Sequence, residues 1–153
     1  VLLALGAEAT IESPSKRETI DLEALLKRGG VPGGVVLSLS FRQPPAGTFR
    51  FAKVARRKPH GASVLSIAAV LPLADRKVKD ARIAYGAMAP APFRARPVEK
   101  ALDGKALDRT TIDAAIKVAT EGCAPLSDPQ ASEWYRRTVL PVHLRRLLSG
   151  EVA

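Results

Sequence analysis

Aromatic residues are scarce in this chain of 153 residues, since Phe, Trp and Tyr together make up 5% of it. A core must therefore be built from Ala, Val, Leu and Ile, and at this length one domain, or a small domain with a partner segment, is expected. Cysteine is scarcer still. The single Cys123 excludes an internal disulfide and a cysteine-rich metal site, and we expect it to be a small buried residue of a protein from a reducing, cytoplasmic compartment.

Long apolar runs are also lacking. The longest, from Ala62 to Leu73, is interrupted by serine and proline and is too short to cross a bilayer, so we expect no membrane span. The first residues, "VLLALGAEATI", have neither an initiator methionine nor a basic leader, and they are typical of the inside of a domain. We therefore expect the chain to be a fragment of a longer protein.

Charge is unbalanced rather than lacking. The 24 Lys and Arg residues outnumber the 15 Asp and Glu residues and give a net charge of +9, which favours acidic partners. The basic residues are spread over four separate segments instead of forming one stripe, and few aromatic residues accompany them. This distribution makes nucleic-acid binding a weak alternative.

Motifs that carry chemistry are absent from the sequence. It contains no phosphate-binding P-loop, no dinucleotide fingerprint and no histidine pair at metal-ligand spacing. The two histidines, His60 and His143, are isolated, and an isolated histidine is usually structural or solvent-exposed. We therefore predict no catalytic residue and no metal site.

The first half of the sequence predicts strands with one short helix. "GAEATIES" has strand-like alternation, and the helix "DLEALLKRGG" follows the loop "PSKRE" with Asp21 as its N-cap and Gly29 just past its end. "VVLSLSF" alternates and predicts a half-buried strand with Val35, Leu37, Leu39 and Phe41 on one face.

Three further strands are predicted after the turn "QPPAG". "TFRFAKVARR" places Lys53 on the face of Phe49 and Phe51, where an apolar residue is expected. "ASVLSIAAVL" is apolar on both faces, as a central strand is, and another strand is expected from about Val78 to Tyr85. Lys53 has two interpretations: a cation that faces a ligand, or an edge lysine that discourages pairing between sheets.

The second half of the sequence predicts helices. Pro97 begins one, Asp108 caps a second, and Ser132 or Asp128 caps a third that extends through "EWYRRTVLPVHLRRLL". In this last helix we expect Trp134 and Tyr135 to form the core and rim of a helix–sheet interface. The predicted fold class is α+β, an antiparallel sheet of three to four strands with about three helices packed on one face.

Four stretches stand in a familiar order: "FRFAKVARR", "ASVLSIAAVLPL", "VKDARIAYGAMAPAPFRARPVEKALDGK" and "SDPQASEWYRRTVLPVHLRRLL". Together they resemble the C-terminal domain of the FAD-binding subunit of molybdenum hydroxylases, the family of carbon monoxide dehydrogenase medium chains and xanthine dehydrogenase flavoproteins. The most specific positions are Gly86, Pro92, Arg94, Glu99, Leu102, Gly104 and Lys105, followed by the "SD" to "YRR" stretch.

This resemblance implies a sandwich-like α+β domain at residues 48–153, preceded at residues 1–47 by the tail of the FAD-binding domain and a linker. It implies FAD as cofactor, with molybdopterin and two [2Fe–2S] clusters in partner subunits, the molybdopterin subunit and the iron–sulfur subunit. By position in the motif, Lys53 matches a lysine near the flavin ring, and Val36 and Leu37 lie on the strand that borders the cofactor. The chain would then be a component of an oxidoreductase complex that passes electrons from the clusters through FAD to a final acceptor, without being catalytic by itself.

The sequence departs from the family pattern at three places. The glycine loops that hold the FAD pyrophosphate belong to the part of the flavoprotein before Val1, so we expect FAD to be bound mainly by residues outside this chain. Gln130 replaces a common arginine, and Gly61 replaces a common acidic residue. The alternative is a non-catalytic interaction or scaffold module that keeps the fold without FAD.

Overall fold

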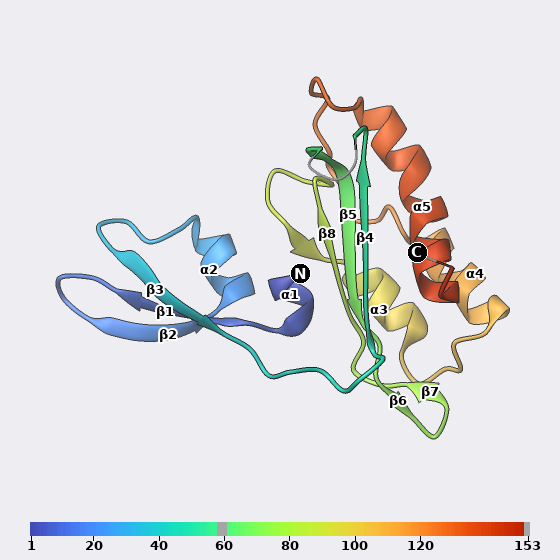
Figure 1. Cartoon of the computed structure of the whole chain (residues 1–153), viewed down its shortest axis with the longest axis horizontal. Helices are drawn as coiled ribbons and strands as arrows, with labels where there is room; N and C mark the ends of the chain where they lie inside the picture. Colours follow the sequence, from blue (N-terminus) through green and yellow to red (C-terminus); the bar gives the residue numbers. More distant parts are fainter. Residues whose placement is uncertain (58–60, 152–153) are drawn as a thin grey trace.

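The computed structural model describes residues 1–57 and 61–151, and it arranges them as two lobes that lie side by side (Figure 1). The first lobe is a small antiparallel sheet in the order β2-β1-β3 with one helix on it. A short helix, α1, precedes this sheet in the sequence. The elements are α1 (Leu2–Leu5), β1 (Glu8–Glu12), β2 (Arg17–Asp21), α2 (Leu22–Arg28) and β3 (Val35–Ser40).

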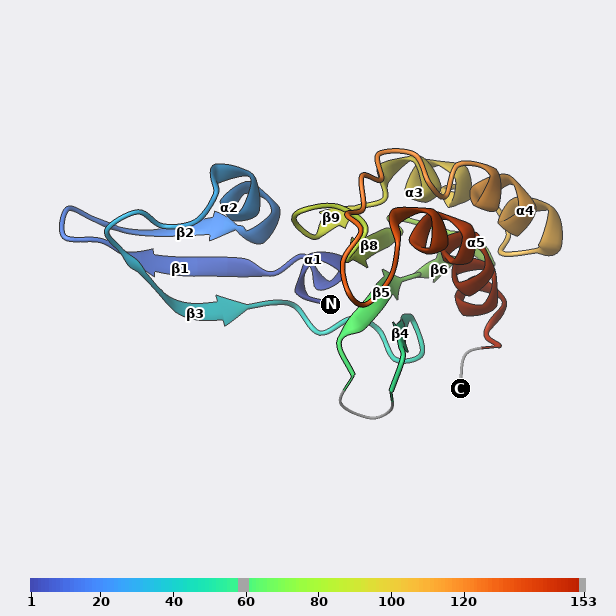
Figure 2. The same ribbon diagram turned by 90° about the horizontal axis from the view of Figure 1, so that it is seen from above.

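The second lobe is an antiparallel sheet of four strands in the order β4-β5-β8-β9, with three helices on one face (Figure 2). A two-stranded hairpin, β6-β7, extends from its lower end. The strands are β4 (Phe49–Ala55), β5 (Ser63–Val70), β6 (Leu73–Ala74), β7 (Lys77–Val78), β8 (Arg82–Gly86) and β9 (Phe93–Arg94). The helices are α3 (Arg96–Leu102), α4 (Arg109–Lys117) and α5 (Glu133–Ser149). The predicted α+β class is confirmed.

Helix boundaries follow their capping residues. The Asp21 carboxylate accepts hydrogen bonds from the Glu23 and Ala24 backbone N–H groups at the start of α2, and Gly29 ends that helix in a left-handed conformation. Asp108 and Ser132 cap α4 and α5 in the same way. All three predicted caps are confirmed.

The main core lies between the four-stranded sheet and its helices. Leu65 and Ile67 of β5 and Ile83 of β8 point to this side, where they meet leucines of α5. The partners include Leu140, Leu144, Leu147 and Leu148, all buried. The other face of the sheet has a smaller cover, because α1 places Leu3 and Ala4 over Ala68 and Ala84. β5 is thus the central, doubly covered strand that its sequence predicts.

Several predicted boundaries and exposures in the first half are wrong. The segment expected as the loop "PSKRE" ends in β2, which pairs along its full length with β1. The strand expected from Val78 to Tyr85 begins only at Arg82, since the residues before it form the β6-β7 hairpin and a turn. β3 is a strand, but it is exposed along its full length instead of half-buried, because α2 covers β1 and leaves this edge strand bare.

Candidate functional site

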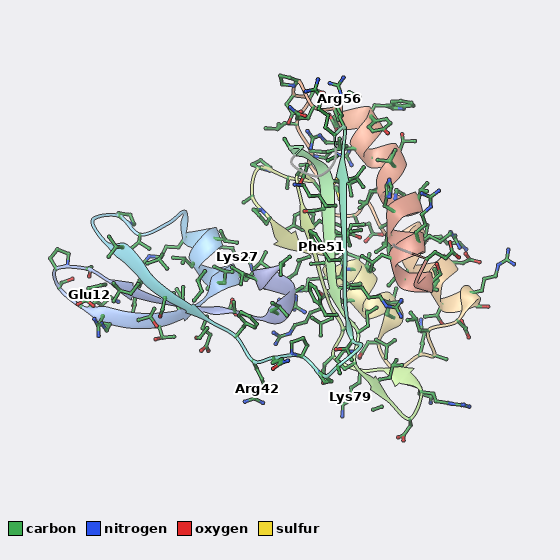
Figure 3. The ribbon with its side chains drawn as sticks, in the orientation of Figure 1. Glu12, Lys27, Arg42, Phe51, Arg56 and Lys79 are labelled. Carbon is green, nitrogen blue, oxygen red and sulfur yellow. The ribbon has the colours of Figure 1, made fainter. Side chains whose placement is uncertain are left out.

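Lys53 lies on the face of the four-stranded sheet that the three large helices leave open. Strand pairing sets Phe51 opposite Ala68, and Lys53 opposite Ser66. Along β4 the residues alternate, so that Ala52 is buried toward the helices whereas Phe49, Phe51 and Lys53 are exposed on the other side. Figure 3 labels Phe51 on the side of the sheet that faces the first lobe. The predicted common face of Phe49, Phe51 and Lys53 is therefore confirmed.

Small residues continue this face across the neighbouring strands. Ser66 lies opposite Gly86 on β8, and a Cβ atom added at Gly86 would lie 2.5 Å from Ser66 Oγ, so a side chain there would require the serine hydroxyl to move. We call Phe49, Phe51, Lys53, Ser66 and Gly86 the open face. A mostly apolar hollow of about 430 Å³ lies beside it, with walls and floor from Val1, Leu2, Leu3, Leu22, Leu26, Ser66, Ala68, Ala84, Tyr85, Gly86 and Pro92.

The Lys53 ammonium has no ion-pair partner within residues 1–57 and 61–151. Its cross-strand neighbour is a serine, and the residues beside it on β4 are uncharged. The open face therefore presents a free cation next to two phenylalanine rings and a floor of small residues. This combination can accommodate a flat, mostly apolar group that carries partial negative charge at one edge.

Val36 and Leu37 lie apart from Lys53, on β3 of the first lobe. The pairing with β1 passes from Thr10–Ser38 to Ile11–Val36, so Leu37 is the extra residue of a β-bulge. The bulge breaks the predicted alternation of Val35, Leu37, Leu39 and Phe41. Val36 and Leu37 are 47% and 49% exposed, and neither lines the apolar hollow. The structure therefore places the three predicted cofactor residues on two separate sheets joined by residues 41–48.

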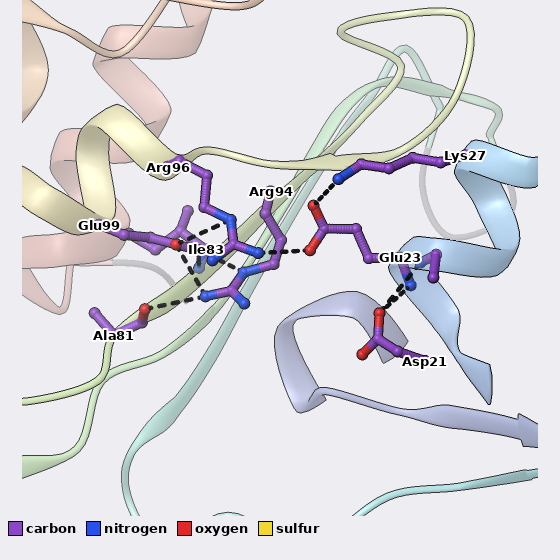
Figure 4. Close-up of polar contacts among 9 residues, drawn as sticks. Asp21, Glu23, Lys27, Ala81, Ile83, Arg94, Arg96 and Glu99 are labelled. Carbon is purple, nitrogen blue, oxygen red and sulfur yellow. Dashed lines mark hydrogen bonds and ion pairs between the residues drawn. The ribbon is translucent and has the colours of Figure 1, made fainter. Parts of the chain in front are cut away.

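A charged network joins the two lobes (Figure 4). Arg94 donates two hydrogen bonds of 2.9 Å to the buried Glu99 carboxylate, which also accepts the Ile83 backbone N–H at 2.7 Å. Arg96 at the start of α3 reaches across to the first lobe and donates to Glu23 at 2.7 Å. Lys27 pairs with the same carboxylate at 3.1 Å. The Glu23 carboxylate is thus the polar link between the lobes.

The pKa of Glu23 reflects this link. Partial burial alone would raise the pKa, but hydrogen bonds from Lys27 and Arg96 outweigh it and hold the pKa below the ordinary value of 4.5.

Two groups in the main core have raised pKa values. Burial raises the pKa of the Cys123 thiol to about 11 and raises the pKa of Tyr85 as well. Cys123 is therefore the small buried residue that the sequence predicts.

Arg136 is a buried charged residue whose role was not predicted from the sequence pattern. Its side chain is 2% exposed, and its guanidinium donates to the Val64 and Ala87 carbonyls and to the Asp128 carboxylate. It therefore fixes the start of β5 and the end of β8 to α5. The signal available in the sequence was its position one turn before Leu140, on the helix stripe that faces the core. Arg137, the next residue, pairs with Glu133 at 2.9 Å.

Trp134 corrects another prediction. Its side chain is 72% exposed and Tyr135 is 44% exposed, so neither forms the core of the helix–sheet interface. Arg136 and Leu140 lie on the side of the helix that faces the sheet. Trp134 and Tyr135 therefore point away from the core.

Metal ligands do not gather among the described residues, where no group of three His, Cys, Asp or Glu side chains lies close enough to hold an ion. No helix in the described ranges is long and apolar enough to cross a bilayer. His60 lies outside the described residues. His143 on α5 has its pKa lowered by burial and by Arg146.

Comparison with known proteins places these features in context. Residues 50–150 match the family described as the CO dehydrogenase flavoprotein C-terminal domain. The chain is 39% identical over 93 residues to the glyceraldehyde dehydrogenase medium chain of Sulfolobus acidocaldarius, which covers 60% of this chain and 32% of that protein. It is 30% identical over 115 residues to the carbon monoxide dehydrogenase medium chain of Afipia carboxidovorans, which covers 75% of this chain and 40% of that protein.

Two solved structures share the fold. A chain of reconstituted CO dehydrogenase from Oligotropha carboxidovorans aligns with a TM-score of 0.84 at 26% identity, over 97% of this chain and 53% of that chain. A chain of quinoline 2-oxidoreductase from Pseudomonas putida 86 aligns with a TM-score of 0.82 at 27% identity, again over 97% and 53%. The chain thus spans about half the length of these structures, and less than half of the two medium chains.

Proposed function

Because the chain belongs to the family of CO dehydrogenase flavoprotein C-terminal domains, we propose that it is the C-terminal part of the FAD-binding subunit of a molybdenum hydroxylase. In this role residues 48–153 form the C-terminal domain and residues 1–47 complete the preceding flavin-binding domain. The single observation that carries the proposal is the free Lys53 cation on the open face, at a position where the family resemblance expects a lysine beside the flavin.

The open face fits the ring portion of FAD. A bound FAD supplies reversible two-electron and one-electron redox chemistry. The Lys53 ammonium would stabilise negative charge on a reduced flavin, and Phe51 with the small floor at Ser66 and Gly86 would provide apolar contact surface. In this proposal residues outside the chain hold the diphosphate, because the sequence contains no glycine-rich phosphate-binding motif.

Val36 and Leu37 take a second role in the proposal. A bulged edge strand with exposed apolar side chains on both faces is unfavourable in water, so it needs a cover. We assign that cover to the remaining FAD-binding domain together with the cofactor. The strand then borders FAD through Val36 and Leu37, whereas Lys53 approaches it from the second lobe.

The proposed subunit works as part of a larger assembly. A molybdopterin subunit would oxidise the substrate, an iron–sulfur subunit with [2Fe–2S] clusters would pass the electrons on, and FAD beside Lys53 would deliver them to a final acceptor. The proposal places the complex in the cytoplasm, in line with the single buried cysteine. The isolated chain is then a component of an oxidoreductase, without catalysis of its own.

Substitution of Lys53 tests this role in the assembled complex. Lys53→Met keeps the length of the side chain and removes the charge. We expect a lower FAD content, or a flavin reduction potential that is more negative by about 20 mV, because a partly exposed cation contributes on the order of 1 kcal/mol to a nearby charge. Lys79→Met, an exposed lysine at the far end of the second lobe, is the matched control (Figure 3).

The readouts are FAD released per complex and the potential from a spectroscopic redox titration. If Lys53→Met leaves both at the values of the Lys79→Met control, the role of Lys53 is refuted. A titration of the isolated chain with FAD addresses the second part of the proposal. We expect no binding, and stoichiometric binding would contradict the view that residues outside the chain hold the cofactor.

A further inference from the structure

One end of the second lobe exposes large apolar side chains that the fold does not use. Trp134, the only tryptophan in the chain, is 72% exposed on the first turn of α5. Leu126, in the loop before the helix, is exposed to a similar extent, and the neighbouring Tyr135 is partly exposed. Aromatic residues bury large areas when they find a partner, so the high exposure of Trp134 on an ordered helix needs an explanation.

The segment that carries these side chains is held in one conformation. Ser127 Oγ accepts a hydrogen bond of 2.9 Å from the Glu133 backbone N–H, which folds the loop back onto the start of α5. The Asp128 carboxylate accepts the backbone N–H groups of Gln130 and Ala131 as well as the Arg136 guanidinium. These contacts, led by the Ala131 N–H, lower the pKa of Asp128. Trp134 and Leu126 are therefore presented in a preorganised arrangement, which lowers the entropic cost of binding a partner.

Positive charge lies at the same end of the lobe as the start of α5 (Figure 1). Arg56 at the end of β4 donates a hydrogen bond of 3.2 Å to the Pro129 carbonyl, so the tip of the sheet contacts the same loop (Figure 3). A hollow of about 450 Å³ lies there, and its described lining, Arg56, Arg57, Gly61, Ala62 and Gln130, includes no carboxylate.

The acidic residues close to this hollow are already neutralised. Asp128 pairs with Arg136 at 2.6 Å, and Glu133 pairs with Arg137 at 2.9 Å. Arg56 and Arg57 form no ion pair within the described residues. Among the described residues, this end of the lobe therefore carries two uncompensated cations and an exposed tryptophan.

We propose that Arg56, Arg57, Leu126, Gln130 and Trp134, the Trp134 surface, dock an acidic patch with an apolar centre on another subunit of the complex. Tryptophan and arginine are the residues that dominate the energetics of protein–protein interfaces, and an aliphatic residue such as Leu126 offers nothing to a stacked base. Carboxylates of the partner enter the basic hollow, and an apolar pocket of the partner covers Trp134. This inference rests on the proposed function, because it takes its partner from the assembled complex.

The single tryptophan makes a direct test possible. The chain, as part of its flavoprotein subunit, is produced with 5-fluorotryptophan and assembled with unlabelled iron–sulfur and molybdopterin subunits. The ¹⁹F resonance of position 134, assigned by its loss in Trp134→Phe, is recorded in H₂O and in D₂O before and after assembly. We expect the solvent isotope shift to be large for the free subunit and to be lost in the complex.

Affinity measurements provide the second readout. We expect Trp134→Ala to weaken assembly about tenfold or more, as a central interface residue does. Arg56→Glu should weaken assembly by a similar factor, and it should reduce the dependence on salt. Leu73→Ala and Lys79→Glu are the matched controls, because both sites are exposed at the opposite end of the lobe, and we expect wild-type affinity from both.

The outcomes separate this inference from the proposed function. A complex that forms while position 134 stays open to solvent, or that tolerates Trp134→Ala like the controls, overturns the Trp134 surface and leaves the proposed function intact. No assembly of the wild-type subunit with either partner overturns both. A response of the ¹⁹F resonance to single-stranded DNA, without a response to the partner subunits, overturns the inference in favour of a nucleic-acid surface.

Discussion

The tripeptide "VLS" occurs in β3, at residues 36–38, and again in β5, at residues 64–66. The two copies differ in the burial of their leucine. Leu65 of β5 is fully buried between two neighbouring strands and the helices, whereas Leu37 of β3 is 49% exposed at a bulge on a sheet edge. The same residues with the same strand propensity thus form a core in one lobe and a bare surface in the other. Propensity makes the strand, and the burial of a strand depends on what the rest of the protein places against it.

Truncation of the two leucines is the strongest test of this contrast. We expect Leu65→Ala to lower the free energy of unfolding by about 3 kcal/mol, because it removes buried methyl groups and leaves a cavity. Leu37→Ala in the same chain should change it by less than about 0.5 kcal/mol. Urea denaturation followed by circular dichroism measures both values. Equal losses would mean that β3 is as well covered as β5 and would contradict the difference in burial between the two strands.

A second test concerns Arg136, which anchors the start of β5 to α5. Arg136→Lys keeps the charge but loses the planar guanidinium that serves the Val64 and Ala87 carbonyls and Asp128 together. We expect a loss of about 2 kcal/mol, since buried acceptors are left without donors. Arg137→Lys, next to it on the exposed side, should cost less than about 0.5 kcal/mol. If Arg136→Lys leaves the free energy of unfolding unchanged, the start of β5 is held by packing alone.

The smallest effect is expected where the two lobes meet. Glu23→Gln removes the charge that Arg96 and Lys27 share, and we expect a loss of about 0.5 kcal/mol at neutral pH, because solvent screens the exposed Arg96. The folded-state pKa of Glu23 is depressed, so the contribution is present above pH 4.5 and is lost as the pH falls through the folded pKa. The difference in stability between wild type and variant should therefore shrink as the pH falls below 4.5 and through the folded-state pKa of Glu23. A difference that grows on acidification would contradict the ion pair.

Local features of the fold were predictable because their cause lies within a few residues. The caps at Asp21, Asp108 and Ser132 were found from a side-chain oxygen placed just before an apolar helical pattern. The central position of β5 was equally readable, since a strand that is apolar on both faces requires cover on both.

Features that depend on distant partners were not predictable. β2 was missed because "RETID" becomes a strand only through pairing with β1. Trp134 was placed in the core although Arg136 occupies it, because a buried guanidinium is acceptable only where Val64, Ala87 and Asp128 supply oxygens from other parts of the chain. The placement of Lys53 on the open face was visible in the alternation of β4, whereas its separation from Val36 and Leu37 required the arrangement of the two sheets.

The seat of α1 has a consequence for synthesis. Leu3 and Ala4 pack on Ala68 and Ala84, so α1 leaves the ribosome about eighty residues before β8, one of the two strands on which it packs. Until β5 and β8 are made, Leu3 lacks its native partners on these two strands, and a chain released before β8 would expose it to chaperones and proteases. The cover on this face of the second lobe is therefore made before the sheet that it covers.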